Sequence, residues 1–142
     1  MNISRKKLLR MTSLALAVLL CLSFMTPFAV AEGSPYIGSY GGGMTTGSNG
    51  NVTVSFQITG VGKMDEIGST KVVIYENGTS VKTYLYSNTS GMMGYNKTIH
   101  GSTVTYAGTV GKSYSAYITF QAGKDGDWEN RGMSTNSVTA KT

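Results

Sequence analysis

Residues 111–123 read Gly111-Lys-Ser-Tyr-Ser-Ala-Tyr-Ile-Thr-Phe-Gln-Ala-Gly123. Every second side chain from Tyr114 to Ala122 is apolar or aromatic, whereas the intervening positions, from Ser113 to Gln121, are mostly polar. Successive side chains of a β-strand point to opposite faces, so this alternation predicts a strand with one buried and one exposed face. The other alternating segments are expected to pair with this strand.

Several segments repeat the alternation over shorter lengths. Residues 71–76 and 80–86 flank the dipeptide Asn77-Gly78, which favours a tight hairpin because both residues readily adopt positive φ. Gly, Asn and Ser separate most of the other segments, and these residues favour turns. The predicted strands are residues 51–59, 71–76, 80–86, 102–107, 111–123 and 137–141.

The spacing of these strands leaves no room for crossover helices, which predicts an all-β, antiparallel two-sheet sandwich. Tyr114 follows a turn at the start of its strand, where a tyrosine corner would place the ring in the core and the hydroxyl on upstream backbone. Residues 114–138 therefore resemble the last hairpin of fibronectin type III and immunoglobulin-like domains. A common core is expected to contain Phe56, Ile58, Ile118 and Phe120.

Residues 1–31 have the pattern of a secretory signal peptide. A basic start precedes an apolar run, and Ala29-Val30-Ala31 fits the small-residue cleavage site. The alternative, a membrane anchor, is disfavoured because Ser23 and Pro27 interrupt an apolar run that is short for a bilayer span of about 20 residues. We therefore expect a secreted, extracellular protein whose mature chain begins at Glu32.

Removal of this leader changes the charge of the chain. Four of the twelve basic residues and none of the seven acidic ones lie in residues 1–31, so the mature chain has a net charge of +1. Nothing in that balance favours nucleic acid or stable insertion in a membrane. Cys21, the single cysteine, also lies in the leader, so the mature domain is expected to have no disulfide.

The mature chain divides by composition. Residues 32–50 are rich in Gly and Ser and predict a flexible lead-in, although Tyr36, Ile37 and Tyr40 could form a short first strand. Residues 51–142 are expected to form the β-sandwich domain. Within it, residues 60–69 and 87–97 are predicted to be loops.

Enzyme chemistry has few candidates in this sequence. His100 is the only histidine, so a Ser-His-Asp arrangement would depend on it alone, and its polar surroundings are typical of a surface or turn residue. We identify no catalytic residue and no cofactor, and we expect a protein that is not an enzyme.

An acidic segment near Trp128 is the best candidate for binding. Its carboxylates begin like an EF-hand loop, but Arg131 occupies the position of the required glycine, so we assign no metal site. Trp128 could anchor a ligand, or it could pack over the edge of the core. Residues 60–69 would lie at the same end of an immunoglobulin-like sandwich. The candidate binding residues are Asp65, Glu66, Asp125, Asp127, Trp128 and Glu129.

A broader likeness extends over most of the mature chain. It rests on Met64-Asp-Glu-Ile-Gly68, Lys71-Val-Val-Ile-Tyr-Glu76, Val81-Lys-Thr-Tyr84, Met92-Met93 before His100, Val104-Thr-Tyr-Ala-Gly108 and Gly111-Lys-Ser-Tyr-Ser-Ala-Tyr117. These blocks resemble a family of small, uncharacterised secreted proteins of Gram-positive, mainly clostridial, bacteria. The resemblance implies secretion and a β fold, and it implies no activity.

The expected function is a non-enzymatic extracellular binding or surface-interaction module. Its partner could be cell-wall glycan or an extracellular protein. The alternatives are a small secreted hydrolase that uses His100 or the acidic segment, and a secreted effector that acts on other cells.

Overall fold

The structure is a computed structural model that describes residues 29–30 and 33–142. The predicted signal peptide, residues 1–31, lies outside the described residues except for Ala29 and Val30. No helix in the described part of the chain is long and apolar enough to cross a membrane. The predicted all-β class is confirmed. The strands are β1 (Ala29–Val30), β2 (Ile37–Thr46), β3 (Asn51–Glu76), β4 (Thr79–Leu85), β5 (Met93–Ala107), β6 (Ser113–Lys124), β7 (Asp127–Ser134) and β8 (Val138–Thr139).

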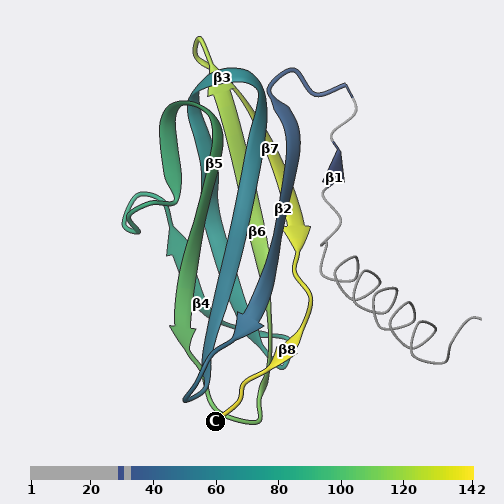
Figure 1. The fold of residues 1–142 in the computed structure, drawn as a ribbon, viewed down its shortest axis with the longest axis vertical. Helices are drawn as coiled ribbons and strands as arrows, with labels where there is room; N and C mark the ends of the chain where they lie inside the picture. Colours follow the sequence, from purple (N-terminus) through teal and green to yellow (C-terminus); the bar gives the residue numbers. More distant parts are fainter. Residues whose placement is uncertain (1–28, 31–32) are drawn as a thin grey trace, which may run out of the picture.

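The 26-residue strand β3 organises the sheet. Its first half pairs with β2 and β5, and its second half pairs with β4 and β6 and, at residues 64–68, also with the start of β5. All pairings between strands are antiparallel, and they join the strands into one continuous eight-stranded sheet. Figure 1 shows that the sheet curls, because β3 runs the length of the molecule and turns over at one end.

The prediction of a loop at residues 60–69 is wrong, because these residues belong to β3. Residues 64–68 pair with the start of β5, and residues 66–69 also pair with β6, so their backbone groups are used in ladders. β3 bends between Thr59 and Met64, where its pairing with β5 shifts register. A side chain at Gly60 would collide with the Gly62 carbonyl oxygen and the Met64 side chain.

The loop predicted for residues 87–97 is also shorter than expected. β5 begins at Met93, because residues 93–97 find partners along the bent part of β3. Met92 is fully buried, and its carbonyl oxygen accepts a 2.9 Å hydrogen bond from the Ser69 amide. The hairpin predicted at Asn77-Gly78 is confirmed, with φ values of 45° and 85°.

The core lies inside the curl of the sheet. Phe56, Ile58, Ile118 and Phe120 all face it, as predicted, and the rings of Phe56 and Phe120 meet edge to face with centroids 6.0 Å apart. A large apolar side chain that becomes fully buried stabilises the fold by about 1.5–3 kcal/mol. Because their side chains alternate between two faces, β3 and β6 provide most of the buried residues of this core. The buried apolar residues are Ile37, Met44, Val52, Val54, Phe56, Ile58, Met64, Ile67, Val72, Ile74, Met92, Val104, Tyr114, Ala116, Ile118, Phe120, Ala122 and Ala140.

The composition of residues 32–50 predicts a flexible lead-in, but residues 37–46 form strand β2 along the first half of β3. The glycines in β2 serve close packing rather than flexibility. A Cβ at Gly42 would collide with the Ile118 side chain and the Ser55 carbonyl oxygen. Beyond its pairing with β1, the outer edge of β2 is tied to the C-terminal segment, because the side-chain amide group of Asn136 bonds both the amide and the carbonyl of Met44 at 3.0 Å.

Tyr114 behaves as predicted from its place after the turn. Its ring is buried, with 1% exposure, and its hydroxyl accepts a 2.7 Å hydrogen bond from the amide of Thr109. The same hydroxyl donates to the Glu76 carboxylate at the far end of β3. Tyr114 therefore joins the turn before β6 to the core and to β3.

Candidate functional site

The β6–β7 turn, the bend of β3 and the start of β2 meet at one end of the molecule (Figure 1), and the candidate residues belong to these elements or to β7. The turn contains only Asp125 and Gly126, with φ values of 55° and 85°, which is the geometry of a tight hairpin. The acidic segment predicted to be a loop therefore belongs mostly to strand β7. Asp-Gly is a strong hairpin signal, and it could have predicted β7 from the sequence.

Strand alternation sends the candidate residues of β7 to opposite faces. Glu129 lies opposite Ala122, which is fully buried, whereas Trp128 lies opposite Gly123 on the outer face. Trp128 is accordingly 57% exposed, while the Glu129 side chain is 9% exposed. The candidate residues that the sequence placed at one end of the domain are thus divided between two faces of the sheet.

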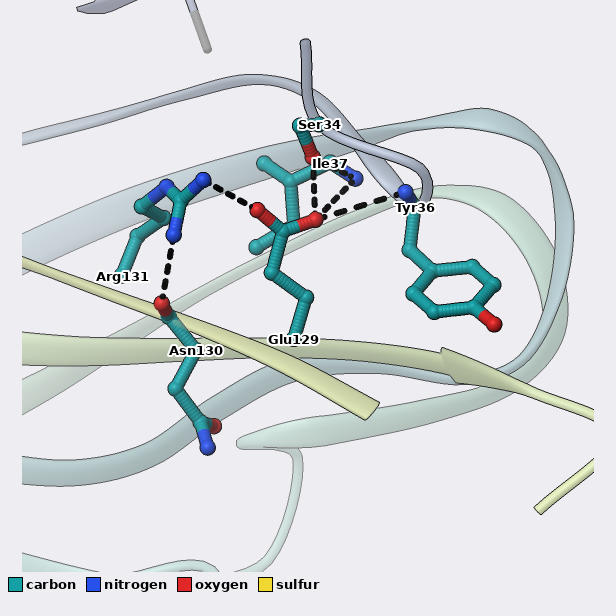
Figure 2. A network of polar contacts seen from close by, with 6 residues as sticks. All are labelled: Ser34, Tyr36, Ile37, Glu129, Asn130 and Arg131. Carbon is teal, nitrogen blue, oxygen red and sulfur yellow. Dashed lines mark hydrogen bonds and ion pairs between the residues drawn. The ribbon is translucent and has the colours of Figure 1, made fainter. Parts of the chain in front are cut away.

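Glu129 holds the start of β2 in place (Figure 2). Its Oε2 accepts hydrogen bonds from the Ser34 hydroxyl and, at 3.3 Å, from the backbone amides of Tyr36 and Ile37. Its Oε1 forms an ion pair with the Arg131 guanidinium. The hydrogen bonds join Glu129 to residues that are more than 90 positions away in the chain.

The same contacts set the ionisation of Glu129. Burial alone raises the pKa of this carboxyl, but the hydrogen bonds from Ser34, Ile37 and Tyr36, together with the charge of Arg131, bring the pKa below its ordinary value. Glu129 is therefore a charged structural group whose acceptor oxygens are already engaged. Its carboxylate is not presented to a ligand in solution.

Asp65 and Asp125 lie in direct contact, which confirms that residues 60–69 and the β6–β7 turn are neighbours. The Asp125 amide donates a 2.8 Å hydrogen bond to Oδ2 of Asp65, so Asp65 closes the turn. Asp127 and Asp125 lie near the Tyr36 hydroxyl, whose pKa is raised first by desolvation and then by these two charges. Within the described residues, no group of three or more acidic, histidine or cysteine side chains could hold a metal ion.

Glu66 and Trp128 share the outer face. Glu66 lies opposite Gly123 on β6, and Gly123 lies opposite Trp128 on β7, so the three positions form one row across three strands. The pyrrole edge of the indole covers Gly123, because a Cβ there would collide with its Cδ1 and Nε1 atoms. The row continues to Tyr95 on β5, which lies opposite Glu66 and is 55% exposed.

Sequence reasoning missed Tyr95 as a site residue. It stands in a segment predicted to be a loop, and only its pairing with β3 places it beside Glu66.

His100 lies on β5, opposite Ile58 of β3. Its Nε2 is 2.7 Å from the Gly91 carbonyl oxygen, and its ring covers Gly94. These contacts hold the strand against the turn that precedes β5. A comparison of the chain with protein-family models, curated proteins and solved structures finds no match.

Proposed function

We propose that this chain is a secreted bacterial β-sandwich protein of the immunoglobulin or fibronectin type III kind, and that it acts outside the cell as a non-enzymatic binding or surface-interaction module. Secretion follows from the leader pattern of residues 1–31. The bacterial origin follows from the resemblance of the sequence blocks described above.

The strand pairing supports the sandwich. The first half of β3 pairs with β2 and β5, and the second half pairs with β4 and β6, beside which β7 lies. On either side of the bend of β3, these two groups of strands would form the two facing sheets of such a sandwich, with the start of β5 crossing the bend to pair with residues 64–68. The buried ring of Tyr114, with its hydroxyl on the Thr109 amide, supports the same assignment.

The observation that carries the binding function is the exposure of Trp128 on a paired strand. Trp128 is 57% exposed, and leaving apolar indole surface in water is unfavourable. Aromatic side chains that are held rigidly are common anchors in binding sites, where a ligand covers that surface. β7 is paired with β6 along its whole length, so the indole is presented without a mobile loop.

Binding of the purified secreted protein to whole cells and to isolated cell walls tests this proposal. We expect retention on at least one of these surfaces, and we expect it to persist when His100 is replaced by alanine or when Asp125 and Asp127 are replaced together. N-terminal sequencing of the secreted protein should begin at Glu32. Hydrolysis of a wall or protein substrate that is lost in either variant would instead support a secreted hydrolase, and damage to other cells without stable retention would support an effector.

A further inference from the structure

We propose that the row Tyr95, Glu66, Gly123 and Trp128, called here the outer row, binds a saccharide chain across the strands. This inference rests on the proposed binding function and names the ligand class and the residues that would contact it.

The register of three strand pairs defines the outer row. Glu66 is opposite both Tyr95 on β5 and Gly123 on β6, and Gly123 is opposite Trp128 on β7. Directly opposed residues of antiparallel strands point to the same face. The adjoining positions Ile67 and Ala122 are fully buried, so the outer row faces away from the core.

The two aromatic side chains stand at the ends of the outer row. Tyr95 is 55% exposed and Trp128 is 57% exposed. Three strand spacings separate them, which corresponds to about 14 Å or less on a curled sheet. This span exceeds one sugar ring and suits a short chain of several rings, with a ring stacked at each end.

Polar side chains lie between and beside the two aromatic rings. Glu66 accepts a 3.4 Å hydrogen bond from the Gln121 amide and forms no ion pair among the residues that the structure describes. Gln121 and Asn130 are opposed to each other in the next row on the same face. Carboxylate and amide groups accept and donate hydrogen bonds, so Glu66, with Gln121 and Asn130 beside it, can bond the hydroxyls of a saccharide.

The absence of a side chain at Gly123 is needed for this arrangement. The indole of Trp128 covers Gly123, which is buried although it lies on the outer face. The ring therefore rests against the strand, and the rest of its surface remains exposed. An aromatic ring supported in this way loses little conformational freedom when a ligand binds.

A saccharide fits the outer row better than a protein does. The exposed aromatic side chains are separated by polar groups and do not form the contiguous apolar centre of a protein interface. Sugar rings present apolar C–H faces beside hydroxyls, and this alternation matches aromatic rings interspersed with a carboxylate and amides.

The test measures binding by isothermal titration calorimetry with the full mature protein and two probes, chitohexaose and purified soluble glycan chains from bacterial cell wall. We expect binding of at least one probe, with the dissociation constant raised about tenfold or more by Tyr95→Ala, by Trp128→Ala and by Glu66→Gln. Tyr86→Ala is the matched control, because Tyr86 is also exposed, at 45%, but lies outside the outer row. It should leave the dissociation constant unchanged, and circular dichroism should show that all variants fold.

Two results would overturn the saccharide inference: binding of neither probe, or binding that the three substitutions in the outer row leave unchanged. In either case, retention on whole cells or walls decides separately whether the protein is a binding module. Release of new reducing ends from the glycan by the wild-type protein would overturn the non-enzymatic function itself.

Discussion

Replacing Glu129 with alanine is expected to lower the free energy of unfolding by about 2–3 kcal/mol. The carboxylate accepts from the Ser34 hydroxyl and from two backbone amides, those of Tyr36 and Ile37, and it pairs with Arg131. A hydrogen bond to a charged group contributes about 1.5–3 kcal/mol, and a buried donor left without a partner costs about 1–3 kcal/mol.

Two features keep the expected loss of unfolding free energy in Glu129→Ala smaller than the sum of these contributions. The Ile37 amide keeps a second acceptor, the Ser34 hydroxyl, at 2.8 Å. The Arg131 side chain is 39% exposed, so water replaces part of the ion pair. For a domain of this size the expected loss corresponds to a fall in Tm of about 10 °C.

Thermal and urea denaturation of the purified protein, followed by circular dichroism, measure this effect. Glu66→Ala is the matched control, because Glu66 is a carboxylate at the same end of the molecule whose one side-chain contact is a long hydrogen bond from Gln121. Glu129→Gln should fall between the wild type and Glu129→Ala, since the amide oxygen can still accept from the backbone. A Tm for Glu129→Ala within about 2 °C of the Glu66→Ala value would refute the argument that Glu129 fastens the start of β2.

Three further predictions concern pH, the core and the edge of β2. The folded-state pKa of Glu129 is lowered, so the stabilising effect of its charge is present above the unfolded pKa of about 4.3 and is lost as pH falls through the folded pKa. Urea titrations should therefore show that the free energy of unfolding falls more between pH 6 and pH 3 for the wild type than for Glu129→Gln. Equal losses of unfolding free energy would contradict this. Phe120→Ala should lower the free energy of unfolding by about 3–5 kcal/mol because the ring is fully buried against Phe56. A loss below about 1 kcal/mol in urea unfolding would contradict this placement in the core. Asn136→Ala removes both bonds to the Met44 backbone, so hydrogen exchange of the Met44 amide should become faster while the exchange of the Ile118 amide changes less; equal acceleration at both amides would mean that the clamp is not local.

The sequence by itself determined the parts of the fold that depend on local chemistry. The alternation in residues 51–59 and 111–123 placed Phe56, Ile118 and Phe120 in the core, because alternate residues of a strand point to opposite faces of the sheet. The hairpin at Asn77-Gly78 followed from the tolerance of those residues for positive φ.

Only the tertiary structure decided where the glycine-rich and acidic segments belong. Composition suggested flexibility for residues 37–46, but Gly42 allows β2 to pack closely against Ile118, a contact between segments distant in the chain. Likewise, the neighbours Trp128 and Glu129 differ in exposure because β7 is a strand, and their partners lie on β6 and at the start of β2. Such partners depend on the register between strands, which is set by packing across the whole sheet rather than by the residues adjacent in sequence.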